Sequence, residues 1–298
     1  MRMFEQISSL RSYVRGMRND ERQKGKTIGF VPTMGALHEG HLGLIRKAKS
    51  DCDIVIGSVF VNPTQFGPNE DLAAYPRTLA RDQQLASQEG LDAMFVPVAA
   101  EIYPAGYQTT VTVPIVSAGL EGAIRPGHFA GVATVVLKLL NIVQPDRLYL
   151  GQKDFQQAVV VDRMIHDLNV PTELIVVPTV RAADGLALSS RNVYLSPEER
   201  RAATILFRTL QTARESVAAG EDSAEQVLLK MHTTLASEPL ARPDYVLLVD
   251  PSTLEPVTAV GEAASIALLA VRIGKTRLID NGLLLPPNYT MPRSRFFI

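Results

Sequence analysis

The stretch from Thr27 to Ser50 constrains the fold more than any other part of the chain. Its first five residues, TIGFV, have the length and composition of a buried strand, and its second half, from His41 onward, spaces apolar residues as an amphipathic helix does. A glycine-containing turn joins the two halves. The first N–H groups of a helix lack partners within the helix, and the helix dipole favours an anion beside them. The stretch therefore predicts a strand, a turn and a helix, with a phosphate-binding position where the helix starts.

Two histidines three residues apart, His38 and His41, lie in this turn and would add hydrogen-bond donors to the phosphate position. Without them, a strand–glycine–helix turn is often only a tight packing feature. A zinc site is another interpretation of His-x-x-His, but Cys52 is the one cysteine and the other three histidines are scattered, so a closed Cys/His zinc site is not expected. The HExxH pattern of metalloproteases is absent. The pattern favours phosphate binding.

Composition excludes several classes of partner. The chain has 298 residues, 46% hydrophobic and 20% charged, with a formal net charge of −1, which is ordinary for a globular protein of one large or two unequal domains. Such a charge gives no overall attraction to nucleic acid or to an anionic membrane. The first residues contain no apolar signal region, no run of 18 apolar residues occurs, and a single cysteine agrees with a reducing compartment. We expect a cytoplasmic protein with neither a nucleic-acid nor a membrane partner.

Strand-like and helix-like segments alternate through the first 180 residues. A helix is predicted over 4–18 with Ser8 as its N-cap. Further strands are predicted at 53–61, 93–97, 147–150 and 172–180, a short β-type patch at 109–113, and helices at 78–89, 131–143 and 155–168. This alternation predicts an α/β fold with a doubly wound, Rossmann-like parallel sheet and right-handed crossovers.

The pattern changes near Arg181. Ser196, Pro197 and Glu199 have the spacing of a capping box with proline in the first turn, so a helix is predicted to start there. Helices are predicted over 197–218 and 223–236, followed by strands at 244–249, 265–271 and 276–281. We therefore expect a first domain over 1–181, a smaller α+β lid domain over 182–285, and an extended or loosely ordered tail over 286–298.

Four polar loops are predicted to carry the chemistry: 32–41, 62–67, 151–157 and 188–192. The first three follow the carboxyl ends of predicted strands, where open α/β sheets bind ligands. The loops offer His38, His41, Lys153, Ser189, Ser190 and Arg191 as donors, and Asn62, Gln65 and Gln157 as neutral polar groups. Cationic donors suit a triphosphate, and neutral amides suit a small hydroxylated substrate.

Seven motifs occur in order over nearly the full length: PTMGALHEGHL (32–42), FVNPTQF (60–66), YPRT (75–78), RPGHF (125–129), GQKDFQQ (151–157), LSSRN (188–192) and TRLIDN (276–281). Residues 34–41 are similar to the HIGH motif of the nucleotidyltransferase superfamily, which includes class I aminoacyl-tRNA synthetases. Within that superfamily the whole chain resembles the pantoate–β-alanine ligase family. The resemblance implies ATP-dependent condensation of (R)-pantoate with β-alanine to pantothenate, AMP and pyrophosphate through a pantoyl-adenylate. It also implies Mg²⁺ with the ATP and a homodimer.

The resemblance assigns roles to individual residues. ATP would be held by Met34, Gly35, Ala36, Leu37, His38, Glu39, Gly40, His41, Gly151, Gln152, Lys153, Asp154, Val180, Leu188, Ser189, Ser190 and Arg191. The catalytic group would be His41, His38, Lys153, Ser190 and Arg191; pantoate would contact Gln65, Gln157 and Met34; and β-alanine would contact Gln65. Position 81 is arginine, where some relatives carry a second acidic residue next to Asp82. No protein ligand to magnesium is therefore assigned, and Asp82 is kept only as a candidate that would act together with the ATP phosphates. The tail matches no family motif and receives no role.

Two other functions compete with this one. A phosphopantetheine adenylyltransferase-like enzyme would have a similar nucleotide site, but its phosphate acceptor would call for more cations than Gln65 and Gln157 provide. An RNA-binding relative of the tRNA synthetases is disfavoured by the net charge and by the absence of an evident anticodon-binding extension. Because no loop offers an evident acyl nucleophile, the acyl group is expected to be activated by ATP itself.

Overall fold

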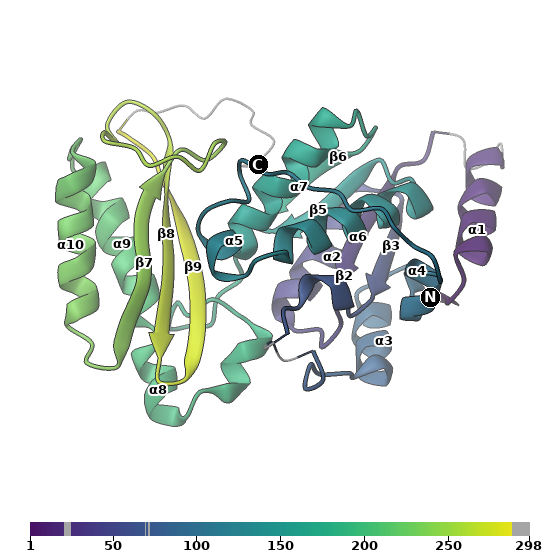
Figure 1. Ribbon diagram of the computed structural model, residues 1–298, viewed down its shortest axis with the longest axis horizontal. Helices are drawn as coiled ribbons and strands as arrows, with labels where there is room; N and C mark the ends of the chain where they lie inside the picture. The colour runs from purple at the N-terminus through teal and green to yellow at the C-terminus, as the bar shows by residue number, and fades with distance from the viewer. Residues whose placement is uncertain (21–24, 69, 71, 288–298) are drawn as a thin grey trace. The chain divides into compact units, whose positions relative to one another are not determined.

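The computed structural model describes residues 1–20, 25–68, 70 and 72–287. Its contacts divide the chain into two compact units (Figure 1). Among the described residues, the first unit contains 1–151 and 156–177, and the second contains 152–155 and 178–287. The functional boundary predicted at residue 181 stays a prediction. The tail predicted over 286–298 lies outside the described residues from position 288 onward.

The first unit is built on a six-stranded parallel sheet with the order β1-β4-β3-β2-β5-β6. The strands are β1 (Arg2–Phe4), β2 (Ile28–Thr33), β3 (Ile54–Val59), β4 (Ala93–Phe95), β5 (Arg147–Gly151) and β6 (Glu173–Val177). Ile28, Phe30, Ile56 and Leu148 are fully buried in the central strands, as expected for a sheet covered on both faces. The strand order reverses between β2 and β5, which is where open α/β sheets bind ligands. The predicted Rossmann-like fold is confirmed.

Seven α-helices accompany these strands in the described part of the first unit, and three of them follow one another between β4 and β5 (Figure 1). They are α1 (Ile7–Asn19), α2 (Glu39–Asp51), α3 (Leu79–Gln88), α4 (Ala99–Ile102), α5 (Glu121–Ile124), α6 (His128–Val143) and α7 (Phe155–Asp167). The apolar face of α2 packs in one cluster with side chains from β2, β3, β5 and β6, including Leu42, Ile45, Val31 and Tyr149. This packing fixes the start of α2 relative to the sheet.

The predicted opening helix is confirmed, but its predicted start and its N-cap are wrong. Residues Arg2–Phe4 form strand β1, and α1 starts at Ile7 after an N-cap at Gln6, not at Ser8. The strand pairs with β4 in the register Arg2↔Ala93. A three-residue strand has little intrinsic signal, and it forms because a distant strand offers its backbone edge.

The β-type patch predicted over 109–113 is also wrong, because these residues form no strand. The N–H of Val111 instead donates to Thr134 Oγ1 on α6 at 2.9 Å. A side chain therefore satisfies the backbone group that a neighbouring strand would otherwise satisfy. Helix α6 itself starts at His128, earlier than the predicted residue 131, after Gly127 at a φ of 84°.

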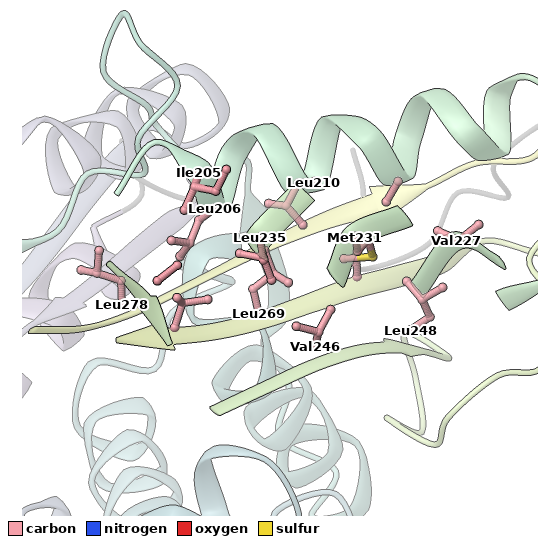
Figure 2. Close-up of a cluster of buried hydrophobic side chains, with 14 of the residues drawn as sticks. Ile205, Leu206, Leu210, Val227, Met231, Leu235, Val246, Leu248, Leu269 and Leu278 are labelled. Atoms are coloured by element: carbon pink, nitrogen blue, oxygen red, sulfur yellow. The ribbon is translucent and has the colours of Figure 1, made fainter. Parts of the chain in front are cut away.

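The second unit contains a three-stranded antiparallel sheet, β7 (Ala241–Val249), β8 (Ser265–Ile273) and β9 (Thr276–Leu284), in sequence order. Its helices are η4 (Ser190–Tyr194), α8 (Pro197–Ala202), α9 (Ile205–Ala218) and α10 (Ala224–Ala236). Figure 2 shows Leu210, Met231 and Leu235 of the helices meeting Val246 and Leu269 of the sheet in one buried cluster. The predicted smaller α+β region is confirmed.

The capping box predicted at Ser196 is present. Ser196 Oγ accepts from the N–H of Glu199 at 3.2 Å, and Glu199 Oε2 accepts from the N–H of Ser196 at 2.8 Å. The helix predicted over 197–218 is divided, since α8 ends at Ala202 and α9 starts at Ile205.

Candidate active site

The predicted site residues fall into two groups, one in each unit. In the first unit, Met34–His41 follow β2, Gln65 follows β3, Gly151 ends β5, and Gln157 lies on α7. In the second unit, Gln152–Asp154 form the short helix η3, and Val180 and Leu188–Arg191 precede or begin η4. The contacts described next fix several of these residues within each group.

His38 and His41 form the start of α2. His38 is the N-cap, and its Nδ1 accepts from the N–H of Gly40 at 3.1 Å. The N–H of His38 points to Nδ1 of His41 at 3.4 Å, and the two rings lie 4.2 Å apart. A ring nitrogen that accepts a hydrogen bond carries no proton, so in each neutral imidazole the proton belongs to Nε2. Both histidines are therefore set as Nε2–H donors beside the N–H groups of the helix start.

The carboxylate of Asp82 holds the turn that precedes these histidines. Its Oδ2 accepts from the N–H of Ala36 at 3.0 Å, and its Oδ1 from the N–H of Leu37 at 2.8 Å and from Thr78 Oγ1 at 3.1 Å. Gly35 and Ala36 have φ values of 85° and 50°, in the left-handed region that costs an alanine free energy. Asp82 is only 1% exposed, and the hydrogen bonds that its oxygens accept stabilise this strained turn.

Gln65 is fixed by the buried side chain of Asn62. Nδ2 of Asn62 donates to Gln65 Oε1 at 3.0 Å and to the carbonyl of Gly131 at 3.2 Å. Oδ1 of Asn62 accepts from the hydroxyls of Thr64 at 2.9 Å and Tyr103 at 2.8 Å. This network orients the amide of Gln65, because its oxygen is used and its Nε2–H₂ group is the end left to meet a ligand.

A second chain of contacts supports the backbone of Gln65. Arg125 pairs with Glu70 through two hydrogen bonds of 2.7 and 2.6 Å, and its third contact is His128 Nε2 at 3.1 Å. His128 Nδ1 lies 2.9 Å from the carbonyl oxygen of Gln65, so Nδ1 is the donor and Nε2 accepts from Arg125. The Arg125 guanidinium holds the pKa of the Glu70 carboxyl below its usual value.

Gln157 and its neighbour Gln156 have different surroundings on α7. Gln156 is buried and donates to the carbonyls of Val116 and Gly119, each at 3.0 Å, while its Oε1 accepts from the N–H of Glu121 at 3.0 Å. Within the described ranges no hydrogen bond is made by the partly buried side chain of Gln157. Gln156 therefore stabilises the backbone of the neighbouring loop, and the amide of Gln157 is available to bind a ligand.

In the second unit, Lys153 lies on a short turn with its Nζ 3.3 Å from Asp154 Oδ1. The N–H of Leu188 donates to the carbonyl of Val180 at 3.0 Å, which joins two of the predicted ATP-binding segments. Ser189 Oγ accepts from the N–H of Arg191 at 3.3 Å and caps η4. Arg191 is exposed, so its guanidinium is accessible to an anion.

The part of the chain that is described contains no group of three or more His, Cys, Asp or Glu residues able to hold a metal ion. Both oxygens of Asp82, the candidate magnesium ligand, already accept hydrogen bonds from the turn. The described residues thus supply no cluster of protein ligands for Mg²⁺, which commonly binds through substrate phosphates and water.

Sequence reasoning named Asn62 only as a neutral polar group and gave Asn281 no role. In the structure Asn62 supports Gln65, and Asn281 of β9 contacts Gln152 and Lys153. The available signal was the residue type and its place. Each is an asparagine within or next to an apolar strand, where an unpaired amide is costly and a buried one therefore needs partners.

Comparisons with known proteins agree over nearly the whole length. Residues 2–283 match the family model described as pantoate-beta-alanine ligase. The chain is 55% identical over 258 residues to pantothenate synthetase of Chloroflexus aggregans, covering 87% of this chain and 93% of that protein. It is 56% identical over 278 residues to pantothenate synthetase of Pelotomaculum thermopropionicum, covering 93% and 97%.

Solved structures of similar proteins carry the same names as the sequence relatives. Pantothenate synthetase from Thermus thermophilus is similar with a TM-score of 0.89 and 45% identity, covering 96% of this chain and all of that one. The pantoate-beta-alanine ligase of Francisella tularensis, complexed with beta-gamma ATP and beta-alanine, is similar with a TM-score of 0.75 and 39% identity, covering 95% and 97%. Across the described residues, none of the helices has the length and apolar character needed to span a membrane.

Proposed function

The chain belongs to the pantoate–β-alanine ligase family, and from this membership we propose how its residues carry out the reaction. The enzyme joins pantoate to β-alanine in an ATP-dependent reaction and forms pantothenate. The family match over residues 2–283 supports this activity over the phosphopantetheine adenylyltransferase-like alternative. The observation that carries the residue assignment is the paired start of α2, where His38 and His41 are both set as Nε2–H donors next to a helix N-terminus.

The chemistry requires that the pantoate carboxylate be activated, because an oxide is a poor leaving group. A carboxylate oxygen attacks the α-phosphorus of ATP, the bond to the bridging oxygen breaks, and pyrophosphate leaves with that oxygen. His38 and His41 donate hydrogen bonds as negative charge moves onto the phosphates. Lys153, Ser190 and Arg191 stabilise the α-phosphate and the departing pyrophosphate. The amine of β-alanine then attacks the acyl carbon, AMP leaves, and the amine loses a proton.

The ATP-binding role of the remaining residues follows from the same resemblance. Backbone N–H groups of 34–41 lie at a helix start and suit phosphate oxygens. Gly151, Gln152, Asp154, Val180, Leu188 and Ser189 complete the proposed set. The Francisella relative, complexed with beta-gamma ATP and beta-alanine, supports the assignment of ATP and β-alanine as ligands.

Pantoate binding is assigned to Gln65, Gln157 and Met34. The Nε2–H₂ group of Gln65, whose oxygen is held by Asn62, donates to a carboxylate or hydroxyl oxygen of pantoate and faces the incoming β-alanine. Gln157 supplies a second amide, and Met34 forms part of an apolar wall for the methyl groups. These neutral groups suit a substrate whose carboxylate has to remain nucleophilic.

Replacing Gln157 with alanine is expected to raise the KM for pantoate strongly, because buried oxygens of the bound substrate lose a partner. ATP binding measured by calorimetry should stay close to that of the unmodified protein. Gln84→Ala, an exposed glutamine on α3, is the matched control and should change neither value. A loss of ATP affinity equal to the loss of pantoate affinity would show that the assignment of Gln157 to the pantoate subsite is wrong.

Magnesium enters this account as the counterion of the substrate MgATP. It supplies positive charge that neutralises the phosphates. If Asp82 supports the turn and does not bind the metal, Asp82→Asn should lower activity without raising the Mg²⁺ concentration needed for half-maximal rate. A strong rise in that concentration would make Asp82 a magnesium ligand.

Three further expectations concern assembly, location and nucleic-acid binding. We propose a homodimer in the cytoplasm without a nucleic-acid partner. Sedimentation at micromolar concentration should give twice the chain mass of 32.5 kDa, and a monomer there would contradict the assembly. Fractionation of cells should recover the protein in the cytoplasm, and filter binding should detect no tRNA complex at physiological salt.

A further inference from the structure

Strand β9 carries two adjacent buried polar residues, Asp280 and Asn281, which are 3% and 2% exposed. They end the TRLIDN motif, to which the reaction described above gives no role. Burial of an aspartate and an asparagine side by side is costly unless both are fully hydrogen-bonded. Their partners therefore indicate what they are for.

The side chain of Asn281 is committed to the segment that carries Lys153. Its Nδ2 donates to the carbonyl of Gln152 at 2.8 Å and to the carbonyl of Lys153 at 3.0 Å. Its Oδ1 accepts from Gln152 Nε2 at 3.0 Å. Both hydrogens and the oxygen of the amide are used on two consecutive residues of η3.

Asp280 fixes the position of this amide. Its Oδ1 accepts from the N–H of Asn281 at 2.8 Å, and its carboxylate pairs with Arg181 through contacts of 2.6 and 2.8 Å. Arg181 also donates to the carbonyl of Gly185 at 3.1 Å. A bidentate, nearly buried ion pair holds Asp280 in place. Because Asp280 in turn accepts from the N–H of Asn281, Asn281 has little freedom to move away from η3.

We propose that Asn281 is the positioning residue that holds Lys153 where its ammonium meets the phosphates of ATP. The inference rests on the proposed role of Lys153. Helix η3 has only three residues and does not hold its own carbonyl groups in place. Asn281 donates a hydrogen bond to the carbonyl of Lys153 itself. Consistent with this, residues 152–155 group with the second unit although residues on both sides belong to the first. Displacement of a catalytic group by about 1 Å can cost 10²-fold in rate.

The test is a double-mutant cycle on pantoate-dependent exchange of labelled pyrophosphate into ATP, measured in the full-length enzyme. Asn281→Ala is expected to lower kcat by about 10–100-fold with less than about a twofold change in the KM for pantoate. In the Lys153→Ala background the same substitution should cost less than about twofold more, because two residues that act through one another are not additive.

Each outcome decides the question. If the losses from Asn281→Ala and Lys153→Ala multiply, Asn281 acts independently of Lys153 and the inference is wrong while the role of Lys153 stands. If Lys153→Ala alone keeps full activity, the proposed role of Lys153 fails, and positioning through it fails as well. An unchanged rate in folded Asn281→Ala also overturns the inference.

Two further variants separate positioning from damage to the fold. Ser265→Ala changes a side chain on β8 that is 1% exposed and makes no hydrogen bond within the described residues, so it should leave the exchange rate unchanged. Asn281→Asp keeps the volume and an acceptor for Gln152 Nε2 but removes the Nδ2 donor. If Asn281→Ala does not fold, Asn281→Asp takes its place in the cycle, with the same expected loss of additivity.

Discussion

Replacing His41 with alanine is expected to lower the rate of pantoate adenylation by about 10²–10³-fold, which is typical of losing one preorganised donor to a developing negative charge. The side chain is partly exposed at the start of α2 and accepts a 3.4 Å contact from the N–H of His38 through Nδ1. The substitution therefore removes the Nε2–H donor and a weak cap contact, and it leaves the apolar core intact. Pyrophosphate exchange should fall while thermal unfolding changes little.

A second variant distinguishes the donor from the cap. His41→Asn retains an acceptor at the place of Nδ1 but has no group at the place of Nε2, so it should be as inactive as His41→Ala. Lys47→Ala on the same helix, which removes an ion pair to Asp51, is the matched control and should keep full activity. Normal turnover of folded His41→Ala would refute the assignment of the phosphate position.

Replacing Lys153 with alanine is expected to reduce adenylation by about 10²-fold or more, because the proposed role of Lys153 is to place a positive charge close to the phosphates. The fold should survive, since the ammonium pairs at 3.3 Å with the neighbouring Asp154, whose side chain is half exposed. Rapid-quench measurement of the first turnover checks the prediction. Lys153→Arg should restore only part of the rate, because a planar guanidinium does not place its charge where an ammonium does.

The fold of the first unit was predictable because its information is local. The apolar runs at β2 and β3 and the helical spacing in α2 lie within short windows, and their alternation leaves few topologies. The prediction of a capping box at Ser196 was confirmed for the same reason, since its residues lie within four positions of one another. Strand β1 was missed because its three residues form a strand only by pairing with β4, which lies about 90 positions away in the sequence.

The support of the site could not be predicted in this way. Asp82 reaches the N–H of Leu37 across 45 positions, and Asn281 reaches the carbonyl of Lys153 across 128. The resemblance to the ligase family made Asp82 the candidate for a magnesium ligand. In the structure, the carboxylate of Asp82 instead accepts hydrogen bonds from the N–H groups of a strained turn. Residue type indicated what the chemistry needs, and tertiary contacts determine which residues hold it in place.

The central claim is that pantoate is activated as a pantoyl-adenylate, so that one carboxylate oxygen of pantoate passes to AMP. The direct test is a complete reaction with pantoate labelled with ¹⁸O in its carboxylate, followed by mass spectrometry of the nucleotide and phosphate products. The account predicts one ¹⁸O atom in AMP and none in pyrophosphate. Label in orthophosphate, with ADP as the nucleotide product, would contradict it and establish an acyl-phosphate route.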